Sequence, residues 1–92
     1  MQFVHIDGKN KKLILDVKAD VSAATTMRIY YRKPDGVKNY WAASAEGDRA
    51  IYYKIQASDL DVSGIWRVQP YVVIDDEEVY GDIERFEAKE NI

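Results

Sequence analysis

Residues 65–74 read IWRVQPYVVI, and this stretch decides the fold class. Apolar side chains recur at every second position, at Trp66 and Val68 and again at Val72 and Ile74. Successive side chains of a β-strand point to opposite faces, so the pattern predicts a strand with one buried row. Proline has no N–H to donate to a sheet. We therefore expect this strand to bulge or to lie at a sheet edge at Pro70.

The same period of two recurs along the chain between clusters of turn-forming residues such as Pro34-Asp35-Gly36. No window of helical length keeps apolar residues at helical spacing. The predicted strands span residues 2–6, 12–18, 25–33, 38–44, 49–56, 65–74 and 78–88. About seven short strands joined by tight turns predict an all-β, antiparallel sandwich, immunoglobulin-like or fibronectin-like, as a single domain over residues 1–92.

The last predicted strand contains a break in parity. Val79, Gly81 and Ile83 alternate regularly, but Phe86 falls on the other parity. A bulge between Ile83 and Phe86 would bring both side chains to the core, and we expect one there.

Composition limits the function classes. The 92 residues carry 13 Lys+Arg against 16 Asp+Glu, a net charge of −3, and no Cys. Without cysteine there is no disulfide framework and no thiolate zinc site. No apolar run approaches the roughly 20 residues of a membrane helix, and the lysines that follow the first apolar stretch reverse the order of a secretory signal. The basic residues are scattered, so we expect neither a membrane nor a nucleic-acid partner.

Catalytic and metal-binding patterns are weak. His5 is the one histidine, and we interpret it as an ordinary strand residue, because zinc would need further ligands and no serine has the context of a nucleophile. We expect no enzymatic activity, no catalytic residue and no cofactor.

One string, DLDVSG at residues 59–64, matches the opening of a calcium-binding EF loop. Such a loop needs a glutamate at its twelfth position, where this chain has Pro70, and it needs flanking helices. We favour a structural role for Asp59 and Asp61, as acceptors of backbone hydrogen bonds in a turn, and keep both as weak candidate metal ligands. The acidic run 75–78 is interpreted as a solvated hairpin tip.

Tyrosine and arginine gather on one predicted sheet face. Residues 25–33, 65–74 and 78–88 are expected to share a sheet, as the third, sixth and seventh strands of such sandwiches do. The outward parity of these strands collects the candidate interface residues Tyr30, Tyr71, Tyr80, Val73, Arg28, Arg32 and Arg67. Protein interfaces favour Tyr and Arg, which cover apolar area while keeping a polar tip. The alternative stays open that exposed strands favour tyrosine and that the arginines keep the sheet soluble.

Several motifs are similar to those of a family of phage structural proteins. They are Lys33-Pro34-Asp35-Gly36, Trp41, Ile51 with Tyr53, Asp59-Leu60-Asp61, Gly64, Trp66, Gln69, Tyr71-Val72 and Phe86. Over residues 2–92 the chain resembles the immunoglobulin-like N-terminal module of the phage baseplate upper protein family, and small tail and baseplate proteins of phages that infect Gram-positive bacteria. The hairpin at residues 75–78 departs from that pattern, which often has glycine there.

The resemblance implies a non-enzymatic virion structural protein of the tail, baseplate or neck region, assembled in the cytoplasm of the host bacterium. Its expected partners are other virion proteins, with copies of itself as a further option. Two alternatives remain. One is a small phage protein that binds and inhibits a host protein. The other is a module that binds host-surface glycans, with Trp41 as the candidate stacking ring.

Overall fold

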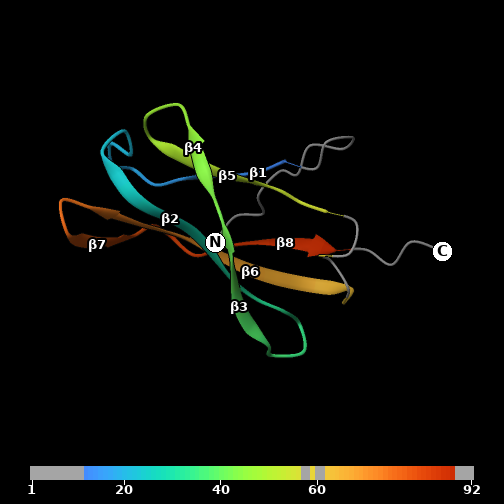
Figure 1. Ribbon diagram of the computed structural model, residues 1–92. Helices are drawn as coiled ribbons and strands as arrows, with labels where there is room; N and C mark the ends of the chain where they lie inside the picture. Colours follow the sequence, from blue (N-terminus) through green and yellow to red (C-terminus); the bar gives the residue numbers. More distant parts are fainter. Residues whose placement is uncertain (1–11, 57–58, 60–61, 89–92) are drawn as a thin grey trace.

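The computed structural model describes residues 12–56, 59 and 62–88, which form two antiparallel sheets packed together as a β-sandwich. The smaller sheet has the order β1-β5-β4 and consists of β1 (Lys12–Asp16), β5 (Ala50–Lys54) and β4 (Ser44–Glu46). The larger sheet has the order β3-β2-β6-β7, with β8 also paired to β6. Its strands are β3 (Lys38–Ala42), β2 (Ala24–Arg32), β6 (Gly64–Ile74), β7 (Glu77–Tyr80) and β8 (Glu84–Ala88), and Figure 1 shows both layers. The predicted all-β sandwich is confirmed.

The strand order is that of immunoglobulin-like sandwiches. In such folds the second, fifth and fourth strands form one sheet, and the third, sixth and seventh form the other. Here the smaller sheet, β1-β5-β4, corresponds to the second, fifth and fourth strands of that fold. In the larger sheet, β2, β6 and the β7–β8 segment correspond to its third, sixth and seventh strands, and β3 is an additional strand beside β2. The predicted strand at residues 2–6, which contains His5, lies outside the described residues.

Two predicted strands are each divided in the structure. Residues 38–44 form β3 in the larger sheet and the start of β4 in the smaller one, and the chain changes sheet at Ala43. Residues 78–88 contribute to β7 and β8, because β6 is too long for one short partner. β7 pairs with β6 near Val72, and β8 pairs with it near Trp66.

Pro70 lies in a strand that is neither bulged nor at an edge there, contrary to the expectation. Its pairing with Ile29 of β2 is in regular register. The carbonyl of Pro70 instead accepts a hydrogen bond of 3.0 Å from the N–H of Gly81, which lies between β7 and β8. The N and C=O of a strand residue point to the same side. The missing N–H therefore faces Gly81, between β7 and β8, where the side-chain amide of Gln69 donates to the Gly81 carbonyl at 3.0 Å in its place.

The expected bulge that would bury both Ile83 and Phe86 is wrong for Ile83. Phe86 is in the core at 2% exposure, whereas Ile83 is 48% exposed. Residues 81–83 leave the sheet between β7 and β8, so the alternation of one strand does not carry into the next.

The core between the sheets is built on aromatic rings around Trp66, which is fully buried. Trp66 stacks on Trp41 at 6.0 Å and on Phe86 at 5.9 Å between ring centroids. Its indole N–H donates to the carbonyl of Val62 at 2.8 Å, which satisfies the polar atom that an indole brings into a core. The inward parities predicted for the strands are confirmed at Leu13 and Leu15, both 0% exposed. The outward tyrosines lie on the other side of the larger sheet.

Candidate interaction face

The outer face of the larger sheet brings four tyrosines and an arginine together. The antiparallel register places Arg28 opposite Tyr71, Tyr71 opposite Tyr80, and Tyr30 opposite Tyr40. Residues opposite one another in neighbouring strands point to the same face, so these side chains are neighbours. We call this group the tyrosine cluster: Arg28, Tyr30, Tyr40, Tyr71 and Tyr80.

Ring contacts connect the tyrosine cluster across β3, β2, β6 and β7. Tyr30 meets Tyr71 edge to face at 5.4 Å and Tyr40 at 5.6 Å, and Tyr71 meets Tyr80 at 5.0 Å. The Arg28 guanidinium lies 4.5 Å from the centroid of Tyr40 and donates to the Tyr30 hydroxyl at 3.3 Å. Aromatic pairs and cation–π contacts each favour a fixed arrangement. The cluster is therefore ordered in the isolated chain.

Tyr71 is buried at the centre of this cluster, at 7% exposure, although it sits on the outward parity. Its hydroxyl donates to the Glu78 carboxylate at 2.7 Å. That hydrogen bond, together with burial and the negative charge of Glu78, raises the pKa of Tyr71 to about 12. Tyr71 thus supports the cluster from beneath, while Tyr40 and Tyr80, 43% and 55% exposed, form its accessible surface.

A second group on the same face is a row of cations. Lys38 lies opposite Arg32, Arg32 opposite Arg67, and Arg67 opposite Arg85. We call these residues of β3, β2, β6 and β8 the cationic row. Like charges placed directly opposite one another in a sheet are destabilising, so this row is unfavourable for the isolated chain.

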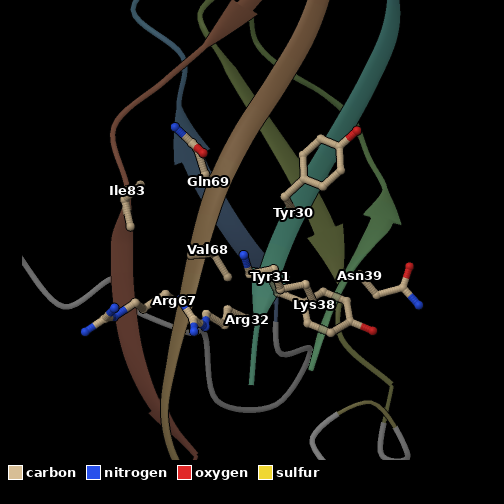
Figure 2. A pocket seen from close by; sticks show the side chains of 9 residues that line it. All are labelled: Tyr30, Tyr31, Arg32, Lys38, Asn39, Arg67, Val68, Gln69 and Ile83. Atoms are coloured by element: carbon tan, nitrogen blue, oxygen red, sulfur yellow. The ribbon is translucent and has the colours of Figure 1, made fainter. Parts of the chain in front are cut away.

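A hollow of about 270 Å³ lies between the cationic row and the tyrosine cluster. Its lining includes Tyr30, Arg32, Lys38, Arg67, Gln69 and Ile83. Figure 2 shows Arg32 and Arg67 side by side at one end of the hollow and Tyr30 and Gln69 toward the other end. Gln69 is held by a 3.0 Å hydrogen bond from its side-chain amide to the carbonyl of Gly81. The hollow offers a neighbouring molecule several cations beside apolar and amide surface.

The predicted interface residues thus divide into separate groups. Arg28, Tyr30, Tyr71 and Tyr80 meet in the tyrosine cluster, and Arg32 and Arg67 meet in the cationic row. Val73 is half-buried between Thr26 and Glu78, toward the β6–β7 turn. Sequence reasoning did not select Tyr40, Lys38 or Arg85 for this face. The alternation of residues 38–44 places Lys38 and Tyr40 on the side opposite the buried Trp41, whereas Arg85 reaches the outer face only because the alternation breaks between β7 and β8. Only the register between strands shows which residues are their neighbours.

Asp59 has a structural part in its turn. One of its carboxylate oxygens accepts hydrogen bonds of 2.7 Å from both the Tyr53 hydroxyl and the Gln56 backbone N–H. Burial, and next the bond to Asp59, raise the pKa of Tyr53 to about 12. Asp61 lies outside the described residues. Within the described ranges, no group of three or more His, Asp or Glu side chains is arranged to hold a metal ion.

Comparison of the chain with protein-family models, with curated proteins and with solved structures found no match. Residues 12–56, 59 and 62–88 include no helix long and apolar enough to span a bilayer.

Proposed function

We propose that the chain is a non-enzymatic structural module that acts by protein–protein association in the tail, baseplate or neck region of a phage virion. The observation that carries this proposal is the tyrosine cluster on the outer sheet face. The resemblance of the chain's motifs to phage baseplate modules suggests the virion as the assembly in which this contact forms. A chain without cysteine is compatible with assembly in the host cytoplasm.

The tyrosine cluster has the properties that favour an interface. Tyrosine and arginine, with tryptophan, are enriched at the energetic centres of protein contacts. Tyr30, Tyr40, Tyr71 and Tyr80 already pack on one another, so little side-chain entropy is lost when a partner covers them. The exposed rings supply apolar area, and their hydroxyls stay available for polar contacts.

One copy of such a contact is expected to be weak. Burial of apolar surface contributes roughly 25 cal/mol per Å² before the losses of rotational and side-chain freedom are subtracted. Many copies repeated in one particle would strengthen the attachment, because each further contact forms within an existing complex. A repetitive virion structure supplies that repetition.

The test is the pair of substitutions Tyr40→Ser and Tyr80→Ser. Both rings are exposed, so we expect thermal stability to change little and the copy number in purified phage particles, measured by mass spectrometry, to fall severely. Tyr52→Ser on β5, which alternates outward from the buried Ile51 on the smaller sheet, is the matched control and should leave the copy number unchanged.

Copy number retained in the Tyr40 and Tyr80 variants, or absence of the wild-type protein from particles, contradicts the proposal. Absence from particles together with capture of a host protein through the same face would favour the inhibitor alternative. The glycan-binding alternative loses its candidate ring, because Trp41 is only 8% exposed and is stacked on Tyr53 at 4.8 Å.

A further inference from the structure

On the premise that the chain is an association module, we propose that its copies bind one another head to tail. The acidic β6–β7 turn of one copy, residues 75–77, docks on the cationic row of the next copy at Arg32 and Arg67. The partner at the hollow is thus a second copy of this chain.

Opposite charges lie near the two ends of one strand. Arg67 is in the first half of β6, and Asp75 and Asp76 follow directly after its last residue, Ile74. At about 3.4 Å per residue, Arg67 and Asp75 are roughly 27 Å apart, in a molecule whose longest dimension is 45 Å. That separation exceeds the screening length of about 10 Å at ordinary ionic strength. The two charge groups can therefore neutralise one another only between copies.

Among the described residues, the cations Lys38, Arg32 and Arg67 of the hollow form no ion pair, although Glu87, opposite Ile65, lies on the same face. The ion pairs of the described residues join Lys12 to Glu46 and Lys18 to Asp82, and neither involves Lys38, Arg32 or Arg67. The planar guanidinium groups of Arg32 and Arg67 are suited to bind a carboxylate through paired N–H donors. A second hollow of about 260 Å³, lined in part by Pro34 and Ile65, lies on the other flank of these two arginines. A carboxylate between them would remove the like-charge repulsion.

The β6–β7 turn presents its carboxylates on a narrow, fixed tip. Ile74 pairs with Glu77, so only Asp75 and Asp76 form the loop. Both have positive φ, 51° and 64°, as in the type I′ turn of two-residue hairpins. Asn and Gly are favoured in such turns, and aspartate is tolerated at some loss of stability. Both aspartates and Glu77 are exposed, and among the described residues no base forms an ion pair with them.

Head-to-tail docking of the turn on the row predicts the symmetry of the oligomers. In the head-to-tail arrangement proposed here, the turn of each copy docks on the row of the next, so each bound copy leaves a turn and a row free and the contact is heterologous. Such contacts produce closed rings or open filaments, not two-fold dimers.

The experiment uses two complementary variants of the full chain. The donor variant carries Asp75→Asn, Asp76→Asn and Glu77→Gln, which remove the charges and retain residues that suit the turn. The acceptor variant carries Arg32→Glu and Arg67→Glu on exposed strand positions. Far-UV circular dichroism checks that both are folded, and sedimentation velocity over a concentration series measures association.

We expect the wild type to form a concentration-dependent series of oligomers that weakens when salt rises from about 50 to about 500 mM. Each variant alone should associate at least about tenfold more weakly, and an equimolar mixture should form one-to-one dimers and no larger species. Asp48→Asn, which removes an exposed acid from another turn, should behave as the wild type, whereas Asp76→Asn alone should weaken association.

A wild type that stays monomeric at every concentration overturns the head-to-tail contact, as does a donor variant that associates like the wild type. If the monomeric wild type is still found in phage particles, and Tyr40→Ser and Tyr80→Ser lower its copy number there, the proposed function stands and only this inference fails. If entry also needs Arg32 and Arg67, the occupant of the row is an acidic segment of another virion protein, not a second copy. Self-association that survives while the protein is absent from particles overturns the proposed function alone.

Discussion

Gly81 lies against the ring of Pro70 in the larger sheet and leaves no room there for a side chain. A Cβ added at Gly81 would lie 2.5 Å from Cγ of Pro70 and 3.4 Å from the carbonyl oxygen of Asp16. The pyrrolidine ring occupies the space that a side chain would need, and the N–H of Gly81 bonds to the Pro70 carbonyl. The interruption between β7 and β8 therefore depends on the absence of a side chain at residue 81.

We predict that Gly81→Ala lowers the free energy of unfolding by about 1–3 kcal/mol, because the added methyl group overpacks this contact. Urea unfolding measures the effect. Pro70→Ala removes the ring, so Gly81→Ala should be less destabilising in that background than in the wild type. Equal effects in both backgrounds would contradict the steric explanation.

The Tyr71–Glu78 hydrogen bond predicts a pH dependence. The pKa of Tyr71 is raised to about 12 in the folded chain, against its ordinary value of 10.0. The bond therefore stabilises the fold fully below pH 10, and the contribution is lost as pH rises from 10 through about 12. Stability measured by thermal unfolding should fall in that window.

Glu78→Gln removes the negative charge and should move one tyrosine back toward ordinary titration, followed by absorbance of the phenolate. Tyr53, whose pKa is raised first by burial and then by Asp59, should keep its late titration in this variant. An unchanged titration curve in Glu78→Gln would show that the carboxylate does not control Tyr71.

At the scale of elements, β6 organises the larger sheet. It pairs with β2 along one side and with β7 and β8 in succession along the other. Its length carries the tyrosine cluster near Tyr71 and the cationic row at Arg67 on one surface. The β6–β7 hairpin then extends it to an acidic tip.

That hairpin offers a test of the conflict between turn stability and charge. Replacing Asp75-Asp76 by Asn-Gly gives the preferred type I′ sequence, and we expect the free energy of unfolding to rise by up to about 1 kcal/mol in thermal or urea unfolding. Head-to-tail association should weaken in the same variant, because the tip has lost its charges. A lower free energy of unfolding in the Asn-Gly variant would contradict the explanation that Asp75 and Asp76 retain charge at a cost in turn stability.

At the scale of the whole molecule, the aromatic core joins the two sheets. Trp66 of β6 stacks with Trp41 of β3, which in turn stacks with Tyr53 of β5 in the other sheet. A small sandwich has few other large side chains with which to fill the space between its layers.

Trp66→Ala should therefore lower the free energy of unfolding by about 3–5 kcal/mol, because it leaves a cavity at the centre of the stack. This is a large part of the roughly 5–15 kcal/mol typical of a domain. Urea unfolding with near-UV circular dichroism measures the loss, and Tyr52→Ser on the outer surface is the control. A loss of less than about 1 kcal/mol would show that the layers are held by other contacts.

The sequence alone determined which class of fold forms and, outside the last predicted strand, which side chains of the strands face inward. Alternation is a local property of an extended backbone, so Leu13, Leu15, Trp66 and Val68 could be placed in the core without any knowledge of the strand partners. The expectation that the third, sixth and last strands share a sheet rested on the general pattern of such sandwiches, and it is confirmed.

Only the tertiary structure decided which residues are lateral neighbours. The alignment of Lys38, Arg32, Arg67 and Arg85 depends on three registers between strands distant in sequence. The burial of Tyr71 on an outward face depends on rings from neighbouring strands, and the interruption at Gly81 depends on the ring of Pro70. Register arises from non-local pairing, which alternation along one strand does not encode.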